Sequence, residues 1–329
     1  MKIVVDAFGG DNAPLEIIKG AALAEQELGV EIILTGDEQM INKCIKENGI
    51  EFKNLEIVHT TDVISMHDEP TTLLKAHKDS SMAVAFRILA EGKADAFVSA
   101  GSTGAVVVGG TLIVKRIKGI KRPALGSMIP SPDSSYFLMD MGANAECRPE
   151  MLVQFGLMAS VYLEKVEGRE NPKIALLNIG TEDTKGTPLQ QEAYKLLENA
   201  PINFVGNIES REMPKGVVDA VITDGFTGNI ALKLIEGSTI TLFKMLKKVF
   251  YKNIVTKIAT LCLKGGLTSI KRKMDASEVG GAPLLGVAKP IIKAHGSSDA
   301  LAIKNAIRQA KQFAERDVIG TISANLENI

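Results

Sequence analysis

The chain has 329 residues, of which 45% are hydrophobic and 23% are charged, and its formal net charge is -1 at pH 7. A chain of this length can bury a large core, and its charge balance gives no overall attraction to nucleic acid, so we expect no nucleic-acid partner. Thirty glycines, no tryptophan and only 5% aromatic residues favour a protein rich in strand-to-helix turns over an aromatic-lined binding module.

Cysteine spacing and hydropathy exclude several other classes. Cys44, Cys147 and Cys262 are far apart, which predicts neither a disulfide framework nor a zinc knuckle and suits a reducing cytosol. The N-terminus lacks the apolar stretch of a signal peptide, and no run of eighteen apolar residues predicts a membrane span. No histidine and carboxylate spacing indicates a metal site. We expect a cytoplasmic protein without a metal.

Short apolar runs alternate with longer segments of helical periodicity, the clearest being residues 15–28 and 189–197. This alternation predicts an α/β fold, with βαβ units and a largely parallel sheet covered on both faces. No linker or repeat divides the chain, so residues 1–329 are expected to form a single domain, with a turn-rich stretch around Pro123, Pro130 and Pro132. The predicted strands are residues 3–5, 31–34, 55–58, 94–98, 137–139, 174–177, 202–205 and 217–222.

The first predicted strand ends in a turn that begins at Asp6. Gly9 and Gly10 allow a sharp bend, and Asp11 or Asn12 would cap the following helix, with Pro14 in its first turn. The alternative is a tight connection that binds nothing.

A second turn, residues 98–105, follows the strand at 94–98. Its backbone N–H groups and two hydroxyls would face an anion. The spacing matches neither a dinucleotide fingerprint nor a P-loop, and a capped helix start is the alternative interpretation. The residues that carry this prediction are Gly101, Ser102, Thr103 and Gly104.

Three further turns follow predicted strands, at residues 140–144, 178–186 and 223–229, and the first precedes a helical pattern that begins near Arg148 and Pro149. In an open parallel sheet, ligands bind beyond the carboxyl ends of the strands, so we expect all five turns to face one crevice. The polar residues singled out here are Asn144, Lys185, Thr227 and Asn229.

Residues 237–274 contain no acidic residue, and apolar side chains recur there near helical spacing. Gly265 and Gly266 are expected to divide the segment into two helices. One interpretation is a helical hairpin whose apolar face packs in the core or in a dimer interface. Another is a basic surface for lipid headgroups or an acidic protein. The basic residues are Lys244, Lys247, Lys248, Lys252, Lys257, Lys264, Lys271, Arg272 and Lys273.

Near the C-terminus, residues 293–299 contain an imidazole, His295, and the hydroxyls of Ser297 and Ser298. His295 would bind phosphate or would pack beside a helix that starts at Ser298, and the residues alone leave both interpretations open.

The chemistry that these residues permit is anion positioning. No G-x-S-x-G elbow is present, and the cysteines lack a histidine and asparagine setting. Transfer of an acyl group to phosphate suits such a site, because phosphate is already anionic and attack on a thioester carbonyl builds charge that needs donors. Lys185 would offset that charge and Asn229 would donate a hydrogen bond. The alternatives are a solvated loop lysine and a helix cap.

The ordered motifs VVDAFGGDNAP, VSAGSTGA, DMGANAECRPE, LLNIGTEDTKGT, VITDGFTGN and KAHGSSD resemble the phosphate acyltransferase family PlsX, and the resemblance covers nearly the whole chain. It implies a homodimeric three-layer α/β/α sandwich related to isocitrate and isopropylmalate dehydrogenases, with a protruding basic amphipathic helix pair. It implies conversion of acyl-[acyl carrier protein] and inorganic phosphate to acyl-phosphate and free carrier, without a cofactor. The product would feed a membrane glycerol-3-phosphate acyltransferase, and the enzyme would associate peripherally with the membrane.

The resemblance also assigns roles to residues. Lys185 in TEDTKG matches the family's proposed catalytic lysine, and Asn229 in DGFTGN matches its proposed asparagine. The excursion at residues 237–274 becomes a contact for the dimer, the carrier protein or the membrane, through Lys244, Lys248, Lys252, Lys257 and Lys264. The expected phosphate-binding and substrate-binding residues are Asp6, Gly9, Gly10, Gly101, Ser102, Thr103, Gly104, Asn144, Thr227, His295 and Ser297.

Three other functions compete with this one. A short-chain phosphotransacetylase using acetyl-CoA shares the implied fold, but its chemistry needs no acid-free helix pair. A dehydrogenase is disfavoured because no dinucleotide fingerprint is present. A non-catalytic membrane-surface scaffold for lipid-synthesis enzymes would explain the basic helices but not the glycine-rich turns.

Overall fold

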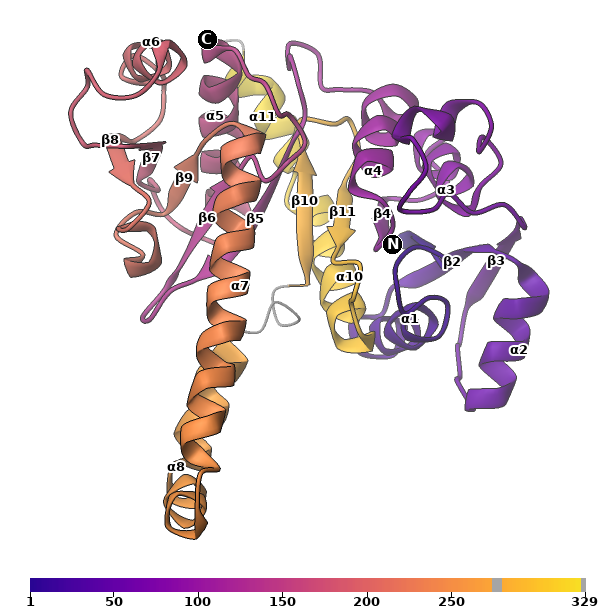
Figure 1. Ribbon diagram of the computed structural model, residues 1–329. Helices are drawn as coiled ribbons and strands as arrows, with labels where there is room; N and C mark the ends of the chain where they lie inside the picture. The colour runs from indigo at the N-terminus through magenta and orange to yellow at the C-terminus, as the bar shows by residue number, and fades with distance from the viewer. Residues whose placement is uncertain (274–279, 327–329) are drawn as a thin grey trace.

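The computed structural model describes residues 1–273 and 280–326, except that several side chains of helix α8, among them that of Lys264, lie outside what is described. Its centre is one eleven-stranded sheet (Figure 1). In sheet order the strands are β3 (Leu55–His59), β2 (Glu31–Gly36), β1 (Lys2–Asp6), β4 (Ala96–Ser99), β11 (Ile291–Ala294), β10 (Gly281–Leu285), β5 (Ala124–Pro130), β6 (Ser135–Met139), β9 (Ala220–Ile222), β7 (Ile174–Asn178) and β8 (Phe204–Glu209).

Helices cover both faces of this sheet. One face carries α1 (Leu15–Leu28), α2 (Glu38–Asn48), α5 (Pro149–Lys165), α6 (Pro188–Leu197), α10 (Ala300–Glu315) and α11 (Val318–Leu326). The other face, which we call the front face, carries the short 3-10 helices η1 (Pro70–Leu74) and η3 (Met213–Lys215), α3 (Ser81–Ala90), α4 (Thr103–Gly109), the π-helical turn η2 (Gly110–Val114) and α7 (Gly225–Phe250). The expected three-layer α/β/α architecture is confirmed.

Alternation along the strands builds this core. In β1, Ile3 and Val5 pack under α1 and α10, whereas Val4 joins the front core beneath α3 and α4. Successive side chains of a strand point to opposite faces, so strands covered on both sides are apolar at every position. That is why the short apolar runs are such direct strand signals in this chain.

The centre of the sheet departs from the prediction. The run around Pro123, Pro130 and Pro132 is a β-hairpin of β5 and β6 instead of a turn-rich stretch, and β10 and β11 were not predicted. Prolines stand at or near the ends of β5, where the ladder lacks one donor at little cost. In β10, Pro283 interrupts a run that would otherwise indicate a strand.

These strands also reverse the direction of the sheet. β11 is antiparallel to β10, β10 to β5, and β5 to β6, while the five strands on one side and the four on the other are parallel among themselves. The carboxyl ends of β1, β4 and β11 therefore lie at one end of the strands, and those of β6, β9 and β7 at the other. The prediction that all five turns share the carboxyl edge of one parallel sheet is wrong.

Beyond its first turns, α7 leaves the body and forms a projecting hairpin with α8 (Ile254–Lys273), as Figure 1 shows. The chain turns at residues 251–253, and the Asn253 side chain caps α8 by accepting from the Thr256 N–H at 2.9 Å. The predicted break at Gly265 and Gly266 is wrong, because both lie inside α8. A helix tolerates interior glycines at a cost of about 1 kcal/mol each.

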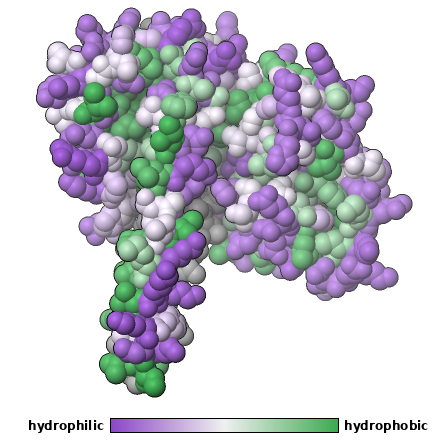
Figure 2. Space-filling model, viewed as in Figure 1, coloured by the Kyte–Doolittle hydropathy of each residue, from purple (hydrophilic) through white to green (hydrophobic). Residues whose placement is uncertain are grey.

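The hairpin leaves much apolar surface uncovered. Phe243, Leu246 and Phe250 are half-buried, but on the other side of α7 Leu242, Met245 and Val249 are each more than half exposed. Packing of this face in the chain's own core is therefore excluded for the described side chains. Figure 2 shows green apolar residues along the hairpin and at its tip, beside purple polar ones. None of the described helices is long and apolar enough to cross a bilayer.

Candidate active site

Three adjacent strands end in a row of polar side chains on the front face. Parallel pairing places Val5 beside Val98, and Ser99 beside Lys293. Asp6 and Ser99, the last residues of β1 and β4, therefore align with Lys293, the next-to-last residue of β11. Alternation then directs Asp6, Ser99 and Lys293 to the same face, because their strand neighbours pack on the opposite one. We call these three residues the polar row.

Asp6 organises this end of the sheet. Its carboxylate is buried and accepts hydrogen bonds from the hydroxyls of Ser81 at 2.6 Å and Ser99 at 2.8 Å. Burial raises the pKa of the Asp6 carboxyl above its ordinary value, and the two serine hydrogen bonds oppose this shift. The Gly101 N–H in turn donates to the Ser99 hydroxyl at 2.9 Å. Asp6 thus supports the turn at residues 98–105 through Ser99.

The glycines predicted as substrate contacts lie where loops cross. A side chain on Gly9 would come within 2.7 Å of the Gly101 nitrogen, and one on Gly10, whose φ is +101°, within 2.9 Å of the Gly296 oxygen. Gly104 faces the Pro70 ring in the same way. Only glycine fits these positions, so each permits close contact between loops far apart in the sequence.

The first turn is joined directly to the last. The Asp11 N–H donates to the Gly296 carbonyl at 2.8 Å, and the Asn12 amide donates to the carbonyls of Ser297 and Ser298. The prediction that Asp11 or Asn12 caps α1 is wrong. The N-cap position is Pro14, and no side chain caps this helix. The turns at residues 9–12, 100–104 and 295–298 therefore converge as one unit.

Hydroxyl and imidazole groups border this unit. Ser102 is the N-cap of α4 and accepts from the Ala105 N–H at 3.5 Å, which leaves its hydroxyl hydrogen for another acceptor, and Thr103 is half-buried beside it. His295 and Ser297 are exposed, and their ring nitrogen Nδ1 and hydroxyl lie 2.8 Å apart. The helix after them begins at Ala300, with Asp299 as its cap.

A second polar set lies at the carboxyl ends of β6, β9 and β7. The buried Asp140 carboxylate accepts from the backbone N–H groups of Leu125, Gly142, Ala143 and Asn144, and burial raises its pKa while the Asn144 side-chain hydrogen bond opposes the shift. The Asn144 amide donates both to Asp140 and to the Pro123 carbonyl. Its side-chain donors are thus engaged in holding the turn.

Asn229 lies beside this turn, in the first turns of α7. The cap of α7 is Asp224, which accepts from the Thr227 N–H and hydroxyl, both at 2.8 Å. Asn229 is therefore not the cap. It is exposed, and its amide group lies 3.5 Å from the position that a Gly142 side chain would take.

Lys185 belongs to the loop after β7. Its carbonyl accepts from the Asn178 amide at 3.1 Å, and its exposed side chain folds against Gly180. β7 pairs with β9, whose end leads into α7, so Lys185 and Asn229 lie at the same end of the sheet.

Helix α7 follows β9 and packs along the front face of the sheet. Its first turns pack on the front core through Ala231, Leu232 and Ile235. Lys233 is one turn beyond Asn229 on the same side of the helix. Burial lowers the pKa of Lys293 in the polar row, and the charge of Lys233 adds to this shift. The two sets of turns themselves end opposite edges of the sheet.

Cys147 is not a nucleophile in this arrangement. Its thiol is half-buried and donates weakly to the Asn144 carbonyl at 3.7 Å. Burial raises the pKa of Cys147 to about 12, with the Asp140 charge acting in the same direction. A thiol this weakly acidic is almost entirely protonated at neutral pH.

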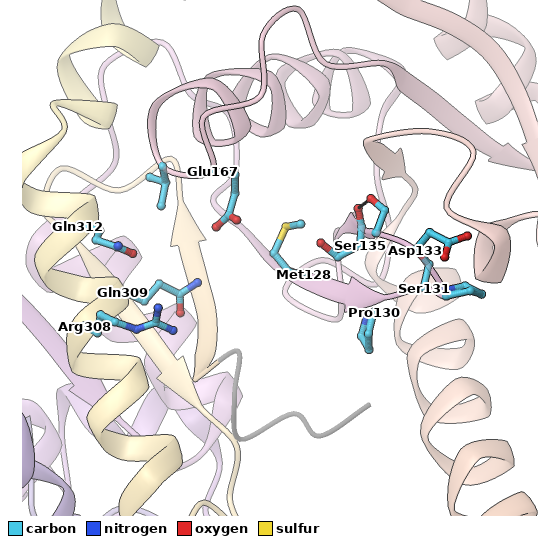
Figure 3. Close-up of a pocket in the computed structure, with 12 residues that line it drawn as sticks. Met128, Pro130, Ser131, Asp133, Ser135, Glu167, Arg308, Gln309 and Gln312 are labelled. Atoms are coloured by element: carbon cyan, nitrogen blue, oxygen red, sulfur yellow. Dashed lines mark hydrogen bonds between the residues drawn. The ribbon is translucent and has the colours of Figure 1, made fainter. Parts of the chain in front are cut away.

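A cavity of about 420 Å³ lies elsewhere, on the α10 side of the β5–β6 hairpin (Figure 3). It contains no candidate site residue. Its lining residues are Met128, residues 130–135, Val166, Glu167, Arg308, Gln309 and Gln312.

Sequence reasoning passed over Ser81, Ser99, Asp140 and Lys293. Ser99, Asp140 and Lys293 each carried a signal in the sequence, because each is a polar residue at the end of a short apolar run. Ser81 carried no such signal, because it reaches Asp6 from the first turn of α3.

Known proteins match this chain over nearly its whole length. Residues 1–321 match the family described as fatty acid synthesis protein. The chain is 47% identical to the phosphate acyltransferase of Alkaliphilus oremlandii, covering 100% of this chain and 98% of that one, and 48% identical to the phosphate acyltransferase of Oceanobacillus iheyensis over the same shares.

Among solved structures, the EutD phosphotransacetylase from Staphylococcus aureus has a TM-score of 0.62 at 17% identity, covering 95% of this chain and 94% of that one. A 4-hydroxythreonine-4-phosphate dehydrogenase from Salmonella typhimurium has a TM-score of 0.51 at 14% identity, covering 94% and 98%. At these identities the likeness shows the fold alone. On the sequence matches over its whole length, the chain belongs to the phosphate acyltransferase family of fatty acid synthesis proteins.

Proposed function

We propose that the chain transfers a fatty acyl group from acyl carrier protein to inorganic phosphate. A phosphate oxygen attacks the thioester carbonyl carbon, the carbon–sulfur bond breaks, and the proton of hydrogen phosphate ends on the carrier thiol. The products are acyl-phosphate and free carrier, and no cofactor is consumed. Relatives named phosphate acyltransferase, at 46–48% identity over nearly the full length, support the reaction type.

The observation that carries this proposal is the convergence of three turns at the polar row. Residues 9–12, 100–104 and 295–298 are tied together by hydrogen bonds, and donors from Ser102, Thr103, His295 and Ser297 border the junction. Phosphate is recognised by such a set of fixed donors, which lose no freedom when it binds. The shared chemistry is anion binding, as the reaction requires.

Lys185 and Asn229 are proposed to stabilise the charge on the thioester oxygen. Both are exposed at the carboxyl ends of β7 and β9, and the Asn229 side chain forms no hydrogen bond within residues 1–273 and 280–326. A lysine and an amide donor are suited to a developing oxyanion.

The α7–α8 hairpin is proposed to bind a second copy of the chain and the carrier protein. Leu242, Met245 and Val249 supply an uncovered apolar strip for a dimer contact, and the exposed Lys248 and Lys252 supply charge. A basic surface suits an acidic carrier and anionic lipid headgroups alike. We extend the proposal to peripheral membrane association, which would deliver the product to a glycerol-3-phosphate acyltransferase.

The test of the substrate is a chain-length series. The purified chain is given phosphate with acetyl, octanoyl and palmitoyl thioesters, each on coenzyme A and on acyl carrier protein, and thiol release is followed. We expect the highest kcat/KM for long-chain carrier thioesters. Preference for acetyl-CoA would instead establish a short-chain phosphotransacetylase, the alternative enzyme. No turnover of any thioester would favour a non-catalytic scaffold.

A further inference from the structure

A lysine is buried at the carboxyl end of β11. Lys293 is 8% exposed, and its ammonium group donates to the carbonyl oxygens of Ala100, at 3.4 Å, and of Ala294. An ammonium group has three N–H donors, so one remains. Within residues 1–273 and 280–326, no carboxylate forms an ion pair with it.

Such a cation is costly to bury. Burial lowers the pKa of Lys293 to about 8, the charge of Asp11 opposes the shift, and the charge of Lys233 adds to it. Removing an ammonium group from water costs several kcal/mol unless an anion or a full set of acceptors compensates. Carbonyl oxygens supply only part of this compensation. Lys233, the cation on α7, is itself paired with Glu236 at 2.7 Å, and no described carboxylate pairs with Lys293 in this way.

The position selects the kind of anion. Lys293 stands in the polar row beside Ser99, under the turn at residues 100–104, and the Gly296 turn borders it. A carboxylate on the surface of a partner protein cannot reach an ammonium group this deeply buried. A small anion suits the position better, because hydroxyl donors lie at the rim of the same unit.

We propose that Lys293 is the cation that holds inorganic phosphate in this enzyme. The proposal rests on the proposed function, which requires a phosphate, and adds the group that binds it. The third Nζ–H donates to a phosphate oxygen, and the carbonyls of Ala100 and Ala294 fix the ammonium in place. Lys185 and Asn229 then act on the thioester oxygen. The charge of the phosphate and the charge that develops on the thioester oxygen are therefore stabilised by different residues.

The test compares Lys293→Met with Lys304→Met, a half-buried lysine paired with Glu27 on the opposite side of the sheet. Binding of inorganic phosphate alone is measured by calorimetry, and KM is measured separately for phosphate and for the thioester. Loss of one charge-assisted hydrogen bond should weaken phosphate binding about 10- to 100-fold in Lys293→Met, with the thioester KM changed less than about twofold. Lys304→Met should leave both unchanged.

A folded Lys293→Met chain with unchanged phosphate affinity overturns the proposal. A second outcome separates the two proposals. If Lys293→Met binds phosphate weakly, and the wild-type chain binds phosphate but never releases carrier thiol, the phosphate site stands and the proposed function fails. If acyl transfer to phosphate is normal in the wild-type chain and in Lys293→Met, the proposed function stands and the role of Lys293 fails. Should the variant not fold, acetylation of Lys293 by acetic anhydride in the unchanged chain decides: phosphate must slow it, and equal rates would refute the assignment.

Discussion

At the scale of single residues, buried carboxylates hold the turns and exposed donors are left for the substrate. Asp6 and Asp140 each stand at or just after the end of a strand and accept several hydrogen bonds there. Asp6 accepts from Phe8 in the loop after β1 and from the hydroxyls of Ser81 and Ser99, and Asp140 accepts from Leu125 on β5 and from the loop at residues 142–144. Their oxygens are thus engaged, whereas Lys185 and Asn229 remain exposed. This division separates residues that support the site from those proposed to act in it.

Lys185→Ala and Asn229→Ala should each lower kcat about 100-fold, the usual effect of removing one donor from an oxyanion. Because both side chains are exposed, the free energy of unfolding should change by less than about 0.5 kcal/mol. Steady-state kinetics and urea titration measure the two quantities. Lys195→Ala, on α6, is the matched control. A variant at Lys185 or Asn229 with normal kcat would remove that residue from the mechanism.

Asp140→Ala should lower the free energy of unfolding by about 3–5 kcal/mol, because it leaves several buried N–H groups without an acceptor. Urea denaturation measures this change. Asp183→Ala, in an exposed loop, should have almost no effect. Equal stabilities for the two variants would contradict the supporting role of Asp140.

Lys293 also predicts a pH dependence of stability. Its pKa is lowered to about 8 in the folded chain, so between pH 8 and about 10.5 the unfolded chain binds the extra proton. The free energy of unfolding therefore rises as pH increases through this window, and the gain is lost as pH falls back through the folded-state pKa of about 8. In phosphate-free buffer, the unfolding free energy relative to Lys293→Met should rise by about 3 kcal/mol across the window. A constant difference would contradict the burial of a charged ammonium group.

At the scale of elements, helix α7 joins a candidate site residue to the α7–α8 hairpin. The start of α7 lies in the front core and presents Asn229, whereas its distal half carries uncovered apolar and basic side chains. A contact made by the hairpin is therefore joined to the candidate site by one continuous helix.

If the proposed dimer forms through the uncovered apolar strip, Met245→Lys with Val249→Lys should convert it to a monomer, since each change places a charge in the strip. Light scattering after size exclusion measures the mass. Leu112→Lys, at a similarly exposed leucine outside the hairpin, is the control. Unchanged mass in the double variant would exclude this strip from the dimer contact.

Lys252→Glu with Lys257→Glu should raise the KM for the carrier thioester at least about tenfold at low salt and leave the KM for the matching coenzyme A thioester unchanged. The difference should shrink as ionic strength rises, because exposed charges are screened. Lys46→Glu, on α2, controls for the change in net charge. Equal effects on both thioesters would point to the site instead of carrier docking.

At the scale of the whole molecule, the sequence predicted the layers and most strands because buried strands are short apolar runs. β5, β10 and β11 escaped prediction since Gly126 and Ser127, Pro283, and Lys293 respectively interrupt their apolar pattern. No local sequence pattern indicates the direction of a strand. The antiparallel pairing of β11, β10, β5 and β6 at the centre of the sheet therefore could not be predicted. The site residues were found as motifs, but their grouping at two ends of the sheet required the pairing itself.

The most direct test of the central claim is phosphate-dependent release of thiol from palmitoyl-acyl carrier protein, without metal or nicotinamide, with acyl-phosphate trapped as the hydroxamate. We predict thiol release that saturates with phosphate, with one equivalent of hydroxamate for each thiol. Thiol release that is independent of phosphate, or that yields only free fatty acid, would contradict acyl transfer to phosphate.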